Sequence, residues 1–144
     1  MSCSNARVCI GLVGLFLISS LVSCSALGGK SEADTTLLQI YFKVAEERAA
    51  DFEKMYQETY APALQVQQGY IRSGLLRVYP EEVLTALQAS LTEFNYQMEL
   101  VFDTEENRQK WVASDEHQVA WPIAQGMAEK VAYRGYDLIG NDAK

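Results

Sequence analysis

Cysteine is absent from the chain after Cys24, so residues 25–144 contain no thiol. Disulfide cross-links, cysteine nucleophiles and thiolate metal sites are therefore excluded from most of the sequence. Histidine occurs only once, as His117, and a metal site built from several imidazoles is not expected. The sequence also lacks a glycine-rich phosphate loop and a nucleophile elbow. A folded domain in this chain has to be held together by its apolar core.

Basic residues are few relative to acidic ones. The 144 residues include 12 Lys and Arg against 19 Asp and Glu, which makes a formal net charge of −7. A chain of this charge is repelled by the phosphates of nucleic acids and by anionic lipid headgroups. We therefore expect no nucleic-acid partner and no direct docking on a membrane surface.

One long apolar run is present, at residues 8–22. It follows a short polar segment whose only charge is Arg7, and it precedes the small residue Ser23. This layout is typical of a secretory signal peptide. A membrane-spanning helix needs roughly 20 apolar residues, so an uncleaved transmembrane anchor is the weaker interpretation.

Residues 21–24, Leu-Val-Ser-Cys, resemble the lipobox of bacterial lipoprotein signals. The resemblance implies that residues 1–23 are removed and that Cys24 becomes the first mature residue and carries the acyl chains. Two or more such chains hold a protein firmly to a membrane. Ser25 is not the aspartate that resembles an inner-membrane retention signal, so the periplasmic face of an outer membrane is favoured. The alternative is an ordinary signal peptide with an incidental cysteine.

The rest of the chain divides into a short segment and one domain. Residues 24–36 hold the anchoring cysteine and a small, polar stretch without apolar periodicity, which predicts a flexible spacer. Residues 37–144 have the length of a single domain.

The order of patterns in this domain predicts an α+β fold, a ferredoxin-like βαββαβ sandwich. Pro62 is expected to break or kink the first helix, and Gly69 to end that unit. Asp103 and Glu106 have the spacing of a capping box, and Ser114 and Pro122 are expected to divide the second helix. Residues 81–93 predict a connector with one helical turn at most. The predicted strands are 37–44, 70–79, 94–102 and 131–139, and the predicted helices are 45–60 and a divided one from 103.

Two of the predicted strands alternate between apolar and polar residues, so that each has one buried face. The apolar faces carry Leu38, Ile40, Phe42 and Val44, and Phe94, Tyr96, Met98, Leu100 and Phe102. The opposite face is only partly polar, which suits either solvent or an interface with another sheet. It carries Gln39, Tyr41, Lys43, Asn95, Gln97 and Glu99.

Three stretches, FEKMY (52–56), GYIRSGLLR (69–77) and YQMELVFDTEENRQKWVASDEHQVAW (96–121), resemble the antibiotic-biosynthesis-monooxygenase family of dimeric α+β barrels. The resemblance implies a homodimer in which two sheets pack face to face. The family includes cofactor-free oxygenases of quinols or polyphenols, haem-degrading enzymes, and members without known activity. The haem-degrading enzymes have an Asn on the first strand, which residues 37–44 lack, so no haem or other cofactor is expected.

The candidate site residues are those expected between the helices and the apolar sheet face. His117 and Trp111 are the candidate catalytic residues, because imidazole is the natural acid–base group at neutral pH. The candidate ligand-binding residues are Phe42, Tyr56, Met98 and Trp121. In the alternative interpretation Trp111 is a core anchor and His117 is solvated or part of a helix cap.

Two classes of function remain open from the sequence. The first is an envelope oxygenase of small aromatic or quinol compounds that works without a cofactor. The second is a non-catalytic dimeric barrel that binds a small apolar ligand or serves as a scaffold. A largely apolar pocket with His117 or a tyrosine hydroxyl pointing into it favours the enzyme.

Overall fold

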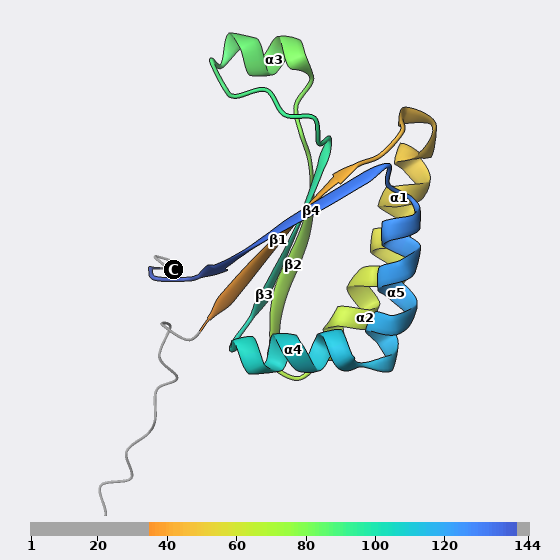
Figure 1. Ribbon diagram of the computed structural model, residues 1–144, viewed down its shortest axis with the longest axis vertical. Helices are drawn as coiled ribbons and strands as arrows, with labels where there is room; N and C mark the ends of the chain where they lie inside the picture. Colours follow the sequence, from red (N-terminus) through yellow and green to blue (C-terminus); the bar gives the residue numbers. More distant parts are fainter. Residues whose placement is uncertain (1–34, 141–144) are drawn as a thin grey trace, which may run out of the picture.

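The computed structural model describes residues 35–140. These residues form a four-stranded sheet with the order β2-β3-β1-β4, in which all neighbouring strands are antiparallel. Together with the helices between the strands, this confirms the predicted ferredoxin-like α+β fold (Figure 1). The strands are β1 (Thr36–Lys43), β2 (Tyr70–Arg77), β3 (Tyr96–Phe102) and β4 (Lys130–Asp137).

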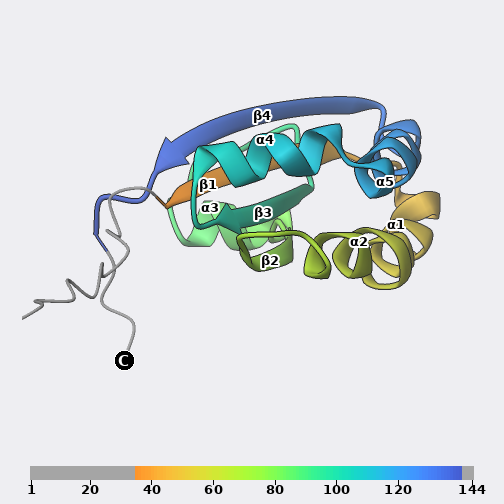
Figure 2. The ribbon, with the colours of Figure 1, turned by 90° about the horizontal axis from the view of Figure 1, so that it is seen from below.

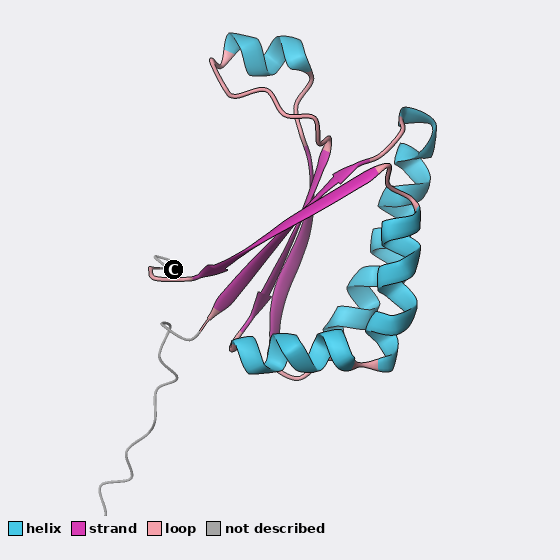
Figure 3. Ribbon diagram, in the orientation of Figure 1, coloured by secondary structure: helices cyan, strands magenta, loops and turns pink. Residues whose placement is uncertain are grey.

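The helices, except the short α3, cover one face of the sheet (Figures 1 and 3). The helices α1, α2 and α5 lie together on one side of the sheet, and α4 runs below the lower ends of the strands toward α5 (Figures 1 and 2). The helical elements are η2 (Glu46–Arg48), α1 (Ala49–Met55), η3 (Tyr56–Tyr60), α2 (Ala61–Gln65), α3 (Glu81–Ala86), α4 (Glu105–Ala113) and α5 (Asp115–Gly126).

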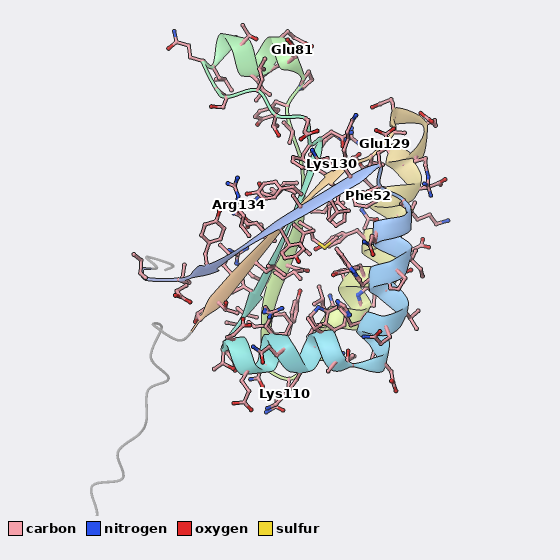
Figure 4. All side chains as sticks on the ribbon, viewed as in Figure 1. Phe52, Glu81, Lys110, Glu129, Lys130 and Arg134 are labelled. Carbon is pink, nitrogen blue, oxygen red and sulfur yellow. The ribbon has the colours of Figure 1, made fainter. Side chains whose placement is uncertain are left out.

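The core lies between these helices and the apolar face of the two central strands. Phe42 of β1 and Met98 of β3 are completely buried, and they are cross-strand neighbours of Tyr96 and Ile40 respectively. Phe52 of α1 packs against the Phe42 ring with centroids 5.0 Å apart, and it lies between helix and sheet (Figure 4). The strict alternation of β1 and β3 therefore places their apolar residues against the helices, as predicted.

Pro62 does not break the first helical unit. The chain stays helical from Ala49 to Gln65, and the turn just before the proline is the π-helical η3. There the N–H of Ala61 donates to the carbonyl of Tyr56, five residues earlier. A proline ring clashes with the carbonyl four residues before it, and a wider π turn relieves this clash. The unit ends before Gly69, as predicted.

The second helical unit is divided at Ser114, not at Pro122. Ser114 Oγ accepts from the His117 N–H at 3.2 Å and caps α5, which continues through Pro122 to Gly126. The cap of α4 is Thr104, whose Oγ1 accepts from the Asn107 N–H, so the predicted capping box at Asp103 is one residue early. Threonine satisfies the first free N–H groups of a helix as aspartate does.

Gly69 is required by the turn that leads into β2. Its φ is +74°, a region that residues with a Cβ rarely adopt. A Cβ here would also collide with the side chains of Asp103 and Asn107, which hydrogen-bond each other at 2.7 Å. The Gly69 carbonyl accepts from the Asp103 N–H at 2.8 Å, so this turn holds the start of α4 against β2.

Residues 78–95 leave the sheet as an arm that carries α3, the helical turn predicted in the connector (Figure 1). The arm exposes Tyr79, Leu87 and Leu91 to solvent. Asn95 is not on the polar sheet face, because its side chain bonds both the N–H and the carbonyl of Val44. Phe94 also differs from the prediction: it packs against Tyr41 on the side away from the core.

The predicted signal peptide at 1–23 and the predicted lipidated Cys24 lie outside residues 35–140, which are those that the structure describes. The predicted spacer extends to residue 36, but Thr36 is already the first residue of β1 and is buried. Among the described residues, no helix is long and apolar enough to cross a membrane.

Candidate functional site

A cavity of about 650 Å³ lies between α4, α5 and the helix-covered face of the sheet. Its apolar wall comes from Ile40 and Leu100 on the central strands and from aromatic side chains on the helices. The side chains that give it chemical character are Tyr60, Glu105, Arg108, Trp111, His117 and Trp121. A volume of this size holds a small-molecule ligand of two or three fused rings.

The mouth of the cavity lies along β4. Tyr133 lines the cavity and is nevertheless 71 % exposed, so this ring is at the boundary with solvent. Thr36 and Asp137 also line the cavity, and they are paired across β1 and β4. Thr35, the first described residue, also lies at this mouth, because its carbonyl accepts from the N–H of Leu138, next to Asp137, at 2.9 Å.

His117 is held between the two tryptophans of the chain. Its ring meets Trp111 edge to face, with centroids 4.9 Å apart and planes at 89°. Trp121, one helical turn further along α5, stacks on it with centroids 6.1 Å apart and planes at 12°. Trp111 in turn packs against the buried Tyr60 at 5.9 Å. The predicted pair of His117 and Trp121 at positions i and i+4 therefore does share one helix face, and that face lines the cavity.

The imidazole of His117 is in its neutral form at pH 7. Burial, and then the positive charge of Arg108, lower the pKa of this ring below its usual value. Nδ1 is buried and is the one such side-chain atom among the described residues without a hydrogen-bond partner. An acceptor nitrogen tolerates the lack of a partner better than an N–H does, which favours the tautomer with the proton on Nε2. The ring then offers an Nε2–H donor.

Arg108 and Glu105 form the charged part of the cavity wall. Arg108 donates from Nε to Glu105 Oε2 at 2.7 Å and from Nη2 to Oε1 at 2.5 Å. The guanidinium holds the pKa of the Glu105 carboxyl below its usual range. Thr36 Oγ1 lies 3.5 Å from the same carboxylate. This side-on pair brings two opposite charges to a wall that is otherwise aromatic.

Three of the six predicted site residues line this cavity together: Trp111, His117 and Trp121. Phe42 and Met98 are completely buried in the core and do not line it, although Phe42 touches Trp121 with centroids 6.3 Å apart. Tyr56 lies elsewhere, where its hydroxyl bonds Ser73 Oγ at 2.8 Å. Burial raises the pKa of Tyr56.

A second, smaller cavity of about 210 Å³ is lined by Tyr56 and by a polar cluster of Glu53, Arg77 and Tyr96. Tyr96 donates to Glu53 at 2.6 Å, and Arg77 pairs with the same carboxylate oxygen. The hydrogen bond from Tyr96, and then that from Arg77, lower the pKa of the Glu53 carboxyl. The side chains of Glu53, Arg77 and Tyr96 are bonded to one another, so we expect this cluster to stabilise the fold.

Sequence reasoning missed Arg108, Glu105 and Tyr133. The sequence did contain a signal for Arg108, because it precedes Trp111 by three residues and so shares its helix face. Tyr133 alternates with Val131 and Gly135, which places these residues on the face that β4 shares with Ile40. Within residues 35–140, no cluster of three or more His, Cys, Asp or Glu side chains could hold a metal ion.

The sheet face away from the helices carries a polar network. Gln39 Nε2 and Gln97 Nε2 each donate to Glu99 Oε1 at 3.1 Å, and Tyr41 donates to Gln39 at 2.6 Å. Arg134 extends on this side of the sheet (Figure 4), and its guanidinium lies 5.7 Å from the centre of the Tyr41 ring. Lys43 pairs at 3.1 Å with Glu129 of the same chain.

No protein-family model matches the chain, and no curated protein matches it. Solved structures do share its fold. SnoaB, a cofactor-independent oxygenase from Streptomyces nogalater, superposes with a TM-score of 0.58 at 14 % identity, over 76 % of this chain and 96 % of that chain. A candidate antibiotic biosynthesis monooxygenase from Caulobacter crescentus gives a TM-score of 0.59 at 15 % identity, over 75 % of this chain and 92 % of that chain.

The same fold also occurs in a protein of different activity. Hydroxynitrile lyase from Passiflora edulis superposes with a TM-score of 0.63 at 8 % identity, over 77 % of this chain and 99 % of that chain. At such identities the likeness establishes the fold alone, since one fold hosts many activities. The chain therefore has the ferredoxin-like α+β fold that these oxygenase-related and lyase structures share.

Proposed function

We propose that this domain binds a small planar aromatic compound of the phenol or quinol type and oxygenates it with molecular oxygen, without a cofactor. The observation that supports this most is the position of His117. It is a neutral imidazole held between two indoles in the wall of a cavity of about 650 Å³. Aromatic walls with one convergent polar group are typical of sites for planar ligands.

The role proposed for His117 follows from its protonation. Oxygenation without a cofactor requires an electron-rich substrate anion that transfers an electron to oxygen. A neutral imidazole with its proton on Nε2 donates a hydrogen bond to such an oxyanion and stabilises it. The Trp111 and Trp121 rings exclude water from this contact and so strengthen it. His117 is in this proposal a donor to the anion and not the base that forms it.

The reaction balances for a substrate whose ring methylene is acidified by an adjacent carbonyl, as in an anthrone. The substrate loses one proton from the methylene carbon to solvent and transfers an electron from the resulting anion to oxygen. The substrate radical and superoxide combine into a carbon-bound peroxide anion, which takes up a proton from solvent to become the hydroperoxide. Loss of water then leaves a carbonyl at that carbon. One oxygen atom of O₂ is thus in the product, and the other leaves in water with the two hydrogens.

Non-catalytic ligand binding is the second candidate function. It is favoured by the absence of a partner on His117 Nδ1, because a catalytic imidazole is usually oriented by a carboxylate or carbonyl there, whether it serves as donor or as base. In this case the same cavity holds the same kind of ligand, and no oxygen is consumed.

We also propose that the protein is a lipoprotein of the bacterial envelope, anchored through Cys24, and that it forms a homodimer through the face of Gln39, Tyr41, Gln97 and Glu99. The described chain begins at Thr35, beside the cavity mouth. The ten residues 25–34 span at most about 35 Å, so an anchored Cys24 keeps the mouth within that distance of the lipid. This supports a substrate that partitions between membrane and water.

The test combines oxygen uptake with ligand binding. Purified full-length protein is incubated with a panel of anthrones and naphthoquinols in the presence of a metal chelator, and oxygen is followed with an electrode. Binding is followed by quenching of tryptophan fluorescence, since the chain has two tryptophans and both line the cavity. The test variant is His117→Ala, which should lower turnover at least about tenfold.

Three outcomes are informative. Consumption of one O₂ per quinone formed from an anthrone, without release of hydrogen peroxide and sensitive to His117→Ala, supports the oxygenase. Quenching without oxygen uptake supports the binding protein instead. Neither quenching nor uptake across the panel contradicts both functions.

A further inference from the structure

Only some of the N–H groups of the Arg108 guanidinium are hydrogen-bonded to the described residues. An arginine side chain has five N–H groups, and Glu105 accepts from two of them, one on Nε and one on Nη2. The other three have no hydrogen-bond acceptor among the described residues. The Arg108 side chain is 21 % exposed, and it lines the cavity. None of the Arg108 nitrogens is a buried atom without a partner, so the free N–H groups reach the open space of the cavity, where the oxygen of a bound ligand can accept from them.

The sign of the charge at this place favours an anion. Arg108 is the one charged group whose field shifts the pKa of His117, and it shifts the pKa downward. Arg108 and His117 line the same cavity, so a ligand beside the imidazole lies near the positive charge of the guanidinium.

We infer that the cavity selects aromatic ligands that carry an anionic oxygen, a carboxylate or an ionised phenol, and that Arg108 binds this oxygen with the N–H groups that Glu105 leaves free. The aromatic part of the ligand lies along Trp111 and Trp121, and the anionic oxygen lies toward Arg108. Glu105 accepts two of the N–H groups and, as an anion beside the same guanidinium, competes with the ligand. This inference rests on the proposed binding function of the same cavity and adds the class of ligand.

The experiment uses two probes of the same shape, 2-naphthoate and 2-naphthamide, which differ in charge at pH 7. Isothermal titration calorimetry with purified full-length protein measures the dissociation constant of each. We expect the wild-type protein to bind naphthoate about tenfold more tightly than naphthamide, or better, as for a hydrogen bond to a charged group.

Arg108→Gln is expected to lower naphthoate affinity about tenfold or more and to change naphthamide affinity less than about twofold. The unchanged naphthamide affinity also shows that this variant is folded. Glu105→Gln, which removes the competing carboxylate, is expected to bind naphthoate at least as tightly as the wild type. The matched control is Arg72→Gln, since Arg72 also pairs with a glutamate but lies on the opposite sheet face. It is expected to bind both probes as the wild type does.

The inference is overturned if the wild type binds the two probes equally, or if Arg108→Gln weakens both to the same extent or neither. It is also overturned if Glu105→Gln loses naphthoate binding, because the pair and not the guanidinium would then be required. Oxygen uptake with neutral substrates only would leave the oxygenase proposal standing and contradict this inference. Naphthoate preference without any oxygen uptake would support this inference and contradict the oxygenase proposal.

Discussion

The imidazole of His117 meets the indole of Trp111 edge to face, at a centroid distance of 4.9 Å and an interplanar angle of 89°. Trp111 is 1 % exposed and belongs to the core, and both residues line the cavity, so the pair connects the core to the candidate site. Edge-to-face contacts of this kind stabilise by about 0.5–1.5 kcal/mol beyond the burial of area. The orientation of the histidine therefore depends on the tryptophan behind it.

Trp111→Ala is expected to lower the free energy of unfolding by about 3–5 kcal/mol, because it removes a large buried side chain and leaves a cavity. Urea unfolding of the purified protein, followed by circular dichroism, measures this. The matched control is Val119→Ala on the exposed side of α5, which should stay within about 0.5 kcal/mol of the wild type. Equal effects of the two changes would contradict the position of Trp111 in the core.

The pH dependence of stability is expected to carry a contribution from His117. Its pKa is lower in the folded protein than the ordinary value of 6.5, so the unfolded chain binds more protons between the two pKa values. The stabilisation from the neutral ring is complete above pH 6.5 and is lost as the pH falls through that window.

Unfolding free energies of the wild type and of His117→Gln, measured at pH 7 and pH 5, test this linkage. The wild type should lose more stability on acidification than the variant, while the carboxylates common to both contribute equally. A difference between the two proteins that is the same at both pH values would show that the folded imidazole titrates normally.

Gly69→Ala is expected to destabilise the protein by about 2 kcal/mol or more, since it combines the strain of a positive φ with a collision at the Asp103–Asn107 pair. Gly74→Ala is the matched control, because a Cβ there meets no atom within 4 Å. Thermal unfolding compares the two, and a larger loss for Gly74→Ala would refute the role assigned to the Gly69 turn.

The proposed homodimer predicts about twice the monomer mass in light scattering at micromolar concentration. Leu76 is 48 % exposed and shares the outer sheet face with Gln97, so Leu76→Glu should shift the mass toward the monomer. Leu87→Glu on the arm is the control, as it places the same charge on an exposed leucine off the sheet. A monomeric wild type at high concentration would disprove the dimer, and a dimer insensitive to Leu76→Glu would disprove this face.

Cys24→Ser is expected to abolish lipidation and to release the protein from membranes, because the thiol is the only attachment point that the lipobox resemblance implies. Fractionation of cells and intact mass spectrometry follow the product. Detection of residues 1–23 on the mature wild-type protein would refute the anchor.

Much of the fold could be predicted from local patterns. Alternation in β1 and β3 identified which residues face the helices, and Gly69 and Ser114 marked a turn and a cap through their own backbone and side-chain preferences. The misplaced positions are those where a tertiary contact competes with a local signal. Phe94 and Asn95 have the alternation of a strand, but the side chain of Asn95 bonds Val44 and β3 begins only after it, at Tyr96.

The candidate site was only partly predictable for a similar reason. The local pattern was enough to place the single histidine on one helix face with Trp121, because a helical period is a local property. Strand alternation likewise placed Phe42 and Met98 toward the helices. That these two are completely buried in the core, while Arg108, Glu105 and Tyr133 line the cavity, depends on the packing of the whole domain. Which buried face remains hollow depends on how the helices cross the sheet, and that is the sum of many distant contacts that no local pattern records.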